Sequence, residues 1–196
     1  MMPELVAQPW WVNAMLLAPL LAYFSWRRAG VPLPARTLVI SGVFAASFGF
    51  LEATVVVYLR AAAGLLPGYR GTLSDVIRLS GEFYRQSQAI GELPQSLITL
   101  EVLREAATIL VLISVAVLSS ANRRSRAAIF LWTFAIWDIV YYAGLWATVR
   151  WPPTLRERDV LFLIPVPWFA PVWFPLLVSA LTLLAVLLTR VRPPRI

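Results

Sequence analysis

The chain has 196 residues, of which 60% are hydrophobic and 14% are charged, whereas a typical soluble domain carries about 25% charged residues. Its net charge is +7 and its mean hydropathy is +0.74. It contains no Cys and no His, which excludes disulfides, thiolate catalysis, Cys/His zinc sites and the usual His ligand of haem. We therefore expect a membrane protein that carries no cofactor or redox centre of its own.

The apolar residues fall into long runs that predict an all-α, polytopic transmembrane helical bundle. A helix needs about 20 largely apolar residues to cross a bilayer, and its backbone polar groups pair internally there. The runs lack the alternating pattern of barrel strands. We predict a single integral membrane domain over residues 1–196 with about five spans, at 10–26, 37–59, 95–120, 127–149 and 168–189.

The longest polar stretch, residues 60–95, separates the second predicted span from the third and carries charges of both signs. Its apolar residues recur near helical spacing, and Ser74 is suited to cap a helix. We predict an amphipathic helix on the outer face of the bundle. An ordered loop packed on the bundle is the alternative.

The segment before the last span has an unusual density of proline, with four prolines in residues 165–175. Proline cannot continue a uniform helix. Irregular backbone at membrane depth occurs only where protein or a water-filled cavity surrounds it. We predict that residues 160–175 form a re-entrant turn or the kinked start of the last helix.

The distribution of Arg predicts the orientation of the chain. The loops 27–36 and 121–126 and the tail 190–196 each carry three Arg and no acidic residue, and such segments face the cytoplasm. This pattern explains the positive charge without a nucleic acid partner. We expect a bacterial inner (plasma) membrane protein with its N-terminus outside and its C-terminus in the cytoplasm.

Charged residues inside the predicted spans are candidate functional residues, because charge at membrane depth is costly. Glu101 and Glu105 share a helix face, and Arg104 lies beside both. The helical rise places these residues, with Glu52 and Asp138, in the outer half or the middle of the bilayer. The candidate site therefore comprises Glu52, Glu101, Arg104, Glu105 and Asp138, with Tyr141 and Tyr142 as hydrogen-bond donors one turn after Asp138, and with Arg60, Arg156 and Asp159 at its outer rim.

Four carboxyl groups against one deep Arg leave an excess of negative charge at this site. Either some of the carboxyl groups carry a proton or a cation binds among them. Oxygen-only ligands are compatible with a divalent cation such as Mg²⁺ or Ca²⁺, and Glu52, Glu101, Glu105 and Asp138 would then hold it. The leading hypothesis is an outward-facing site that binds a cation, a proton or a small polar solute, in transport or solute capture.

Three other interpretations remain open at this point. The chain could be a non-catalytic membrane subunit of a larger respiratory or photosynthetic complex. It could be an intramembrane enzyme that uses the carboxyl groups as general acid and base. The charged residues could also form an interhelical network that only fixes packing. Five spans without an internal repeat are few for a carrier that works alone, so we expect a homo-oligomer or partner membrane subunits in the bilayer.

Overall fold

The computed structural model describes residues 7–62 and 95–191, with the side chains of 59–62 and 95–97 outside that description. This part of the chain is mostly helical. Its elements are the 3₁₀ helix η1 (Trp10–Leu16), α1 (Leu17–Trp26), β1 (Val31–Pro32), α2 (Ala35–Ala62), α4 (Gln95–Ser119), α5 (Arg123–Val149), β2 (Arg158–Phe162), β3 (Trp168–Pro171), α6 (Trp173–Thr189) and β4 (Arg190–Val191).

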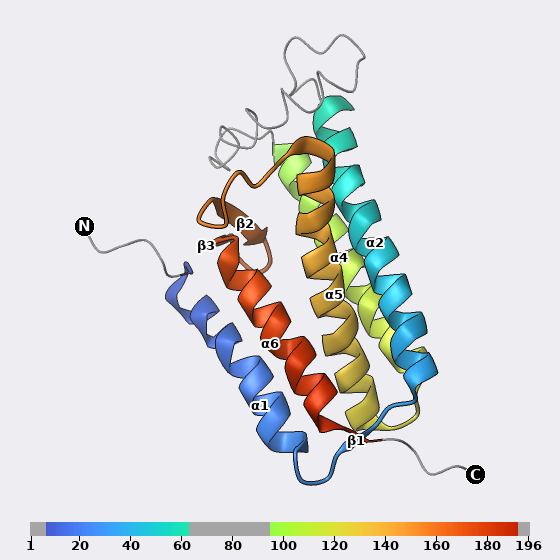
Figure 1. The fold of residues 1–196 in the computed structure, drawn as a ribbon. Coiled ribbons are helices and arrows are strands. Elements are labelled where there is room, and N and C mark those ends of the chain that lie inside the picture. Colours follow the sequence, from blue (N-terminus) through green and yellow to red (C-terminus); the bar gives the residue numbers. More distant parts are fainter. Residues whose placement is uncertain (1–6, 63–94, 192–196) are drawn as a thin grey trace.

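The helices lie side by side as a bundle in which α5 is central (Figure 1). Helix α5 packs against α2, α4 and α6, and α1 packs on the other side of α6. The N-terminal end of α2 and the C-terminal end of α6 lie at one end of the bundle, and the β2–β3 hairpin lies near the other. Since α5 contacts three helices, a polar residue on it can meet partners from several elements.

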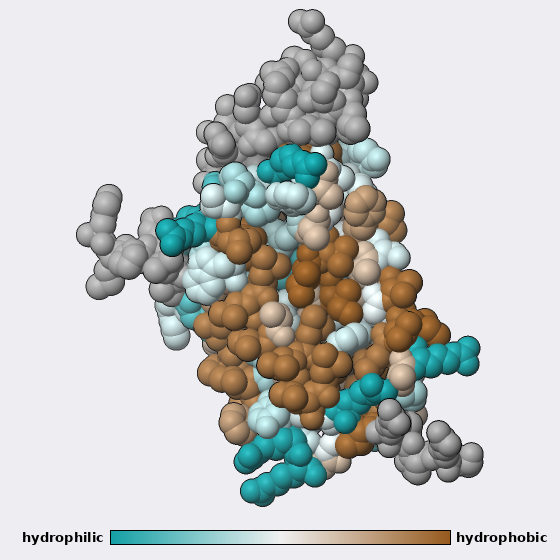
Figure 2. Space-filling model, viewed as in Figure 1, coloured by the Kyte–Doolittle hydropathy of each residue, from teal (hydrophilic) through white to brown (hydrophobic). Residues whose placement is uncertain are grey.

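Three helices are long and apolar enough to cross a membrane, which identifies a membrane-embedded protein. They correspond to Ala35–Tyr58 in α2, Ile98–Ser119 in α4 and Arg123–Val149, the whole of α5. A broad apolar surface covers the middle of the bundle, with hydrophilic residues near both ends (Figure 2). Many large apolar side chains of α2 and α4 are exposed, as expected where lipid is the surrounding solvent.

The backbones of α2 and α5 approach each other closely at Gly49. A Cβ atom at that position would lie 2.5 Å from the backbone oxygen of Trp137, well inside van der Waals contact. Small residues permit such helix contacts in membranes, where dispersion replaces the hydrophobic effect as the driving force. This contact sets the position of α2 relative to the carboxyl groups of the candidate site.

The Arg-rich end of the bundle is held by polar contacts between segments far apart in the sequence. Strand β1 pairs in parallel with β4, and the Arg190 Nε–H donates to the Leu33 carbonyl oxygen at 2.9 Å. The Asn122 side chain caps α5 by accepting from the backbone N–H groups of Arg124 and Ser125. Because of this cap, α5 begins at Arg123, four residues before the predicted start of the span.

The proline-rich segment, for which the sequence predicted a re-entrant turn or the kinked start of the last helix, forms an antiparallel β-hairpin before α6. Strand β2 pairs with β3, and Arg158 is opposite Pro171. The turn contains Pro165 and Pro167, which lack the N–H that a helix requires. The fold is therefore helical with a small hairpin, and α6 begins at Trp173 instead of residue 168.

The hairpin's polar backbone is paired with neighbouring segments. Gln8 exchanges two backbone hydrogen bonds with Phe169, each 2.7 Å long. The Val172 N–H donates to the Glu157 carbonyl oxygen at 2.9 Å. Such pairing allows a non-helical segment to sit against the bundle. The predicted amphipathic helix in residues 60–95 lies almost wholly outside the described residues.

Candidate functional site

The buried charges centre on Arg104, which joins α2 to α4. Its guanidinium group forms an ion pair with Glu52 and donates two hydrogen bonds to Glu101 Oε2, at 3.1 Å from Nε and 2.7 Å from the second terminal nitrogen. The Thr108 hydroxyl donates to the other oxygen of Glu52 at 2.6 Å. We call Glu52, Glu101, Arg104 and Thr108 the Arg104 cluster.

Helical spacing explains why α4 presents this cluster to α2. Arg104 follows Glu101 by three residues, and Thr108 follows Arg104 by four, so the three side chains lie on one face of α4. Glu52 is 6% exposed, so its charge would be costly without Arg104. Both carboxylate oxygens of Glu52 accept hydrogen bonds, so the buried polar groups of the Arg104 cluster have partners.

Glu105 points to a different partner from its neighbour Arg104. It is buried, and its Oε2 accepts the backbone N–H of Leu163 at 2.8 Å. Leu163 immediately follows β2, so Glu105 attaches the hairpin to α4. Among the described residues Glu105 forms no ion pair within 4.0 Å. Its hydrogen bond comes from a neutral donor.

Asp138 is the deepest acidic residue of α5 and joins that helix to α6. It is 7% exposed, and its Oδ2 accepts the Ser179 hydroxyl at 2.8 Å. It lies 11 residues from the C-terminal end of α5, or about 16 Å along the axis. In the part of the chain that the structure describes, no Arg side chain pairs with Asp138.

Tyr142 connects this deep region with the end of the bundle that carries the hairpin. It follows Asp138 by one turn on α5, and its hydroxyl donates to Asp159 Oδ2 at 2.9 Å. Asp138 and Asp159 are both near enough to interact electrostatically with Tyr142. We call Asp138, Tyr142, Asp159 and Ser179 the Asp138 group.

Tyr141 lies between the Arg104 cluster and the Asp138 group. Its ring contacts that of Tyr142 with centroids 5.4 Å apart and stacks on Trp137 at 6.0 Å. It also interacts electrostatically with Arg104. Tyr141 therefore packs in an aromatic group with Trp137 and Tyr142, next to the Asp138 group.

Aromatic rings line the hairpin side of this region. Phe162 of β2 lies 6.5 Å from Trp137 and 6.2 Å from Phe134, measured between ring centroids. The indole N–H of Trp137 is buried and has no hydrogen-bond partner among the described residues. A buried donor of this kind usually has a polar partner, such as water or a bound molecule.

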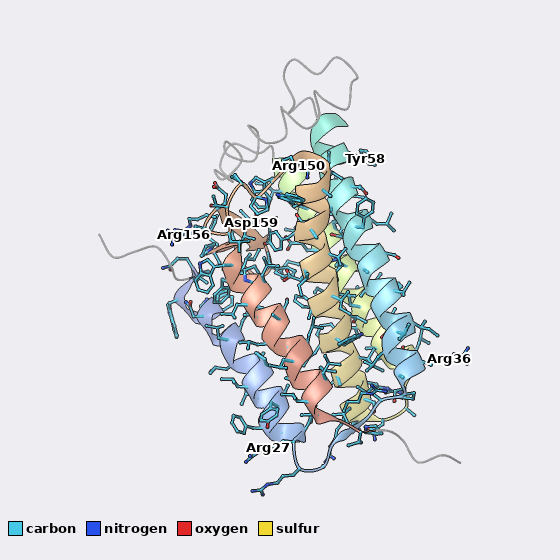
Figure 3. All side chains as sticks on the ribbon, viewed as in Figure 1. Arg27, Arg36, Tyr58, Arg150, Arg156 and Asp159 are labelled. Carbon is cyan, nitrogen blue, oxygen red and sulfur yellow. The ribbon has the colours of Figure 1, made fainter. Side chains whose placement is uncertain are left out.

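Of the two predicted rim residues whose side chains the structure describes, one contributes to the site. Asp159 contacts Tyr142, as described, whereas the exposed side chain of Arg156 forms no hydrogen bond or ion pair with any described residue. Figure 3 shows both residues at the end of the bundle opposite Arg27 and Arg36. The side chain of Arg60 lies outside the described residues.

The four carboxyl groups proposed as metal ligands are not gathered into one ligand set. No group of three or more acidic residues in the described ranges 7–62 and 95–191 is arranged to hold a metal ion. Glu52 and Glu101 are engaged with Arg104, while Glu105 and Asp138 have separate neutral partners. The four carboxyl groups are therefore divided between the Arg104 ion pairs and two separate neutral donors.

Two contributors to the site were not among the predicted residues, Thr108 and Ser179. Thr108 had a detectable signal, because it continues the helix face of Glu101 and Arg104 by one turn. Ser179 is one of three buried polar residues, with Thr182 and Thr189, in the largely apolar helix α6, which is also a signal at membrane depth. Comparisons with protein family models, curated proteins and solved structures found no match.

Proposed function

We propose that this membrane protein binds a proton, or a small cation in its place, at Asp138 and Glu105, and that the binding serves transport or solute capture. The observation that supports this proposal is that the buried carboxyl groups have two different kinds of partner. Arg104 pairs with both Glu52 and Glu101, whereas Asp138 and Glu105 accept hydrogen bonds from neutral groups and form no ion pair with a described residue. Asp138 and Glu105 therefore depend on a bound proton or cation to become neutral.

The Asp138 group suggests the route by which a proton arrives. Asp159 lies near the end of the bundle, Tyr142 donates to it, and Asp138 lies one helical turn deeper. A hydroxyl group can donate and accept, so Tyr142 is suited to pass a proton between two carboxyl groups. The unpaired Trp137 indole suggests that a water molecule or a polar solute belongs beside this route.

The proposal includes a topology of five membrane spans, in which the hairpin lies outside the cell and the Arg-rich end lies in the cytoplasm. Helix α6 is an apolar helix of 17 residues, or about 26 Å of helix. The segment η1–α1 also has 17 residues, but its 3₁₀ portion rises about 2 Å per residue, so it extends about 29 Å. Both lengths approach the roughly 30 Å hydrocarbon core. A bacterial inner membrane location fits the Arg distribution.

The test is proton movement in liposomes that contain the purified full-length chain and a trapped pH-sensitive dye. After an imposed pH step, the wild type should equilibrate faster than protein-free vesicles. Asp138→Asn should reduce the protein-dependent rate at least tenfold, and Glu105→Gln should also reduce it. Glu157→Gln is the matched control, since Glu157 lies outside both clusters. Equal rates in wild-type, Asp138→Asn and protein-free vesicles would contradict the proposal.

A second candidate function is that of a non-catalytic subunit in a membrane complex. The supporting observation is α4, whose apolar residues Leu103, Leu110 and Leu118 are 61%, 63% and 86% exposed. In this function the Arg104 cluster would fix helix packing, and the α4 face would meet a partner helix. Co-purification from native membranes in mild detergent tests it. A stoichiometric partner that is lost with Leu110→Trp would support this second function.

A further inference from the structure

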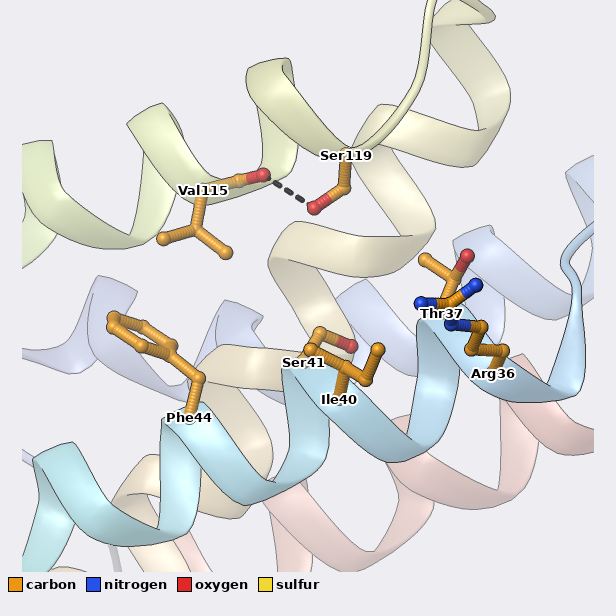
Figure 4. A pocket seen from close by; sticks show the side chains of 7 residues that line it. All are labelled: Arg36, Thr37, Ile40, Ser41, Phe44, Val115 and Ser119. Carbon is orange, nitrogen blue, oxygen red and sulfur yellow. Dashed lines mark hydrogen bonds between the residues drawn. The ribbon is translucent and has the colours of Figure 1, made fainter.

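A groove between α2 and α4 lies at the Arg-rich end of the bundle, far from the carboxyl groups. It has a volume of about 500 Å³ and opens to the surroundings. Figure 4 shows that both helices contribute side chains to it. Its α2 lining begins at Arg36 and reaches Phe44, which are eight residues or about 12 Å apart along the helix.

The groove changes from polar to apolar along its length. Arg36, Thr37 and Ser119 lie at the end nearest the helix termini. Ile40, Phe44 and Val115 line the part that extends toward the membrane interior, together with the buried Ser41, whose hydroxyl donates to the Leu38 carbonyl oxygen at 3.3 Å. The Ser119 hydroxyl donates to the Val115 carbonyl oxygen at 2.7 Å, so it offers only its oxygen to a ligand, and Arg36 and Thr37 are the donors.

The charge at the polar end is positive and uncompensated within the described residues. Arg36 forms no ion pair there, and Thr37 has no side-chain hydrogen bond. The first turn of α5 adds Arg123 and Arg124, both exposed. Basic pockets between helices at the cytoplasmic side of a membrane suit anionic lipid head groups.

We propose that this groove binds one anionic phospholipid of the leaflet at the Arg-rich end. The phosphate group pairs with Arg36 and accepts from Thr37, and one acyl chain lies along Ile40, Phe44 and Val115. The complementarity of both charge and polarity along a single groove favours this ligand over a free anion, which would leave the apolar part empty. The proposal is independent of the function suggested for the carboxyl groups.

The experiment compares lipid retention by the purified full-length protein in neutral detergent, measured by native mass spectrometry. Phosphatidylglycerol and phosphatidylcholine with identical acyl chains are the two probes. The wild type should retain one phosphatidylglycerol in preference to phosphatidylcholine. Arg36→Gln should weaken this retention about fivefold, as expected for one Arg near an anionic head group, and Arg36→Lys should preserve most of it.

Matched variants distinguish the groove from general attraction of lipid to a basic surface. Arg27→Gln removes an Arg from the same end but the opposite side of the bundle (Figure 3), and it should leave retention unchanged. Val115→Trp fills the groove and should reduce retention, whereas Val117→Trp on the exposed face of α4 should not. Excess inorganic phosphate should not displace the lipid. Equal losses in Arg36→Gln and Arg27→Gln, or displacement by phosphate alone, would overturn the proposal.

Discussion

Neutralising Arg104 should destabilise the protein more than neutralising either of its acidic partners. The Arg104 side chain is 20% exposed, that of Glu52 7% and that of Glu101 26%. In Arg104→Gln the buried Glu52 keeps only the Thr108 hydroxyl as a donor. Removing one partner of a buried pair costs about 3 to 5 kcal/mol, and the partial exposure of Arg104 lowers our expectation to about 2 to 4 kcal/mol.

Neutralising the acidic partners of Arg104 should destabilise the protein in the order of their burial, with Glu52 ahead of Glu101. Glu52→Gln leaves Arg104 paired with Glu101 and keeps an acceptor for Thr108, so we expect a loss of about 1 to 2 kcal/mol. Glu101→Gln removes a more exposed group and should cost less than about 1 kcal/mol. The double variant Arg104→Gln/Glu52→Gln should be more stable than the sum of the single losses predicts, because no buried charge is left alone.

The assay is reversible unfolding in mixed micelles, with increasing SDS and with far-UV circular dichroism and tryptophan fluorescence as probes. The free energies are compared at one detergent composition. If Glu101→Gln were as damaging as Arg104→Gln, or if the double variant showed simple additivity, the described division of charge in the Arg104 cluster would be wrong.

Three further predictions concern packing, the hairpin and the proton route. Gly49→Ala should lower the free energy of unfolding by about 1 to 3 kcal/mol, because its Cβ would lie 2.5 Å from the Trp137 oxygen. Gly42→Ala, whose Cβ would have its nearest contact at 3.4 Å, should leave this free energy unchanged or raise it by up to about 1 kcal/mol. SDS unfolding of both variants checks this, and equal effects would refute it. Glu105→Leu should cost about 1 to 3 kcal/mol and increase hydrogen exchange at the Leu163 amide, while Glu105→Gln, which keeps an acceptor, should preserve that protection. Tyr142→Phe should cost about 1 kcal/mol through its lost bond to Asp159 and should slow proton equilibration in the liposome assay, which an unchanged rate would contradict.

The sequence predicted the helical membrane bundle because long apolar runs have one dominant solution in lipid. It also predicted that the charges of α4 would meet Glu52, since an isolated Arg at that depth requires a partner. It did not predict which acid pairs with Arg104. Glu105 is adjacent in sequence, but it points about 100° further around the helix and contacts the hairpin instead.

The hairpin was the main feature that sequence reasoning missed. The proline pattern excluded a uniform helix, but it did not distinguish a kinked helix from two short strands. That choice depends on contacts distant in sequence, such as the pairing of Gln8 with Phe169 and the bond from Leu163 to Glu105. The early start of α5 has a local cause, because the Asn122 side chain caps the helix ahead of the Arg residues that mark the membrane boundary.

In the proposed function, Asp138 exchanges a proton with the surrounding water through the Asp138 group. The most direct measurement is infrared difference spectroscopy of the full-length protein in lipid, recorded while the pH of the buffer is changed. A carboxyl C=O band should respond to pH, shift in deuterated water and disappear in Asp138→Asn but persist in Glu157→Gln. A spectrum in which no carboxyl band depends on Asp138 would contradict it.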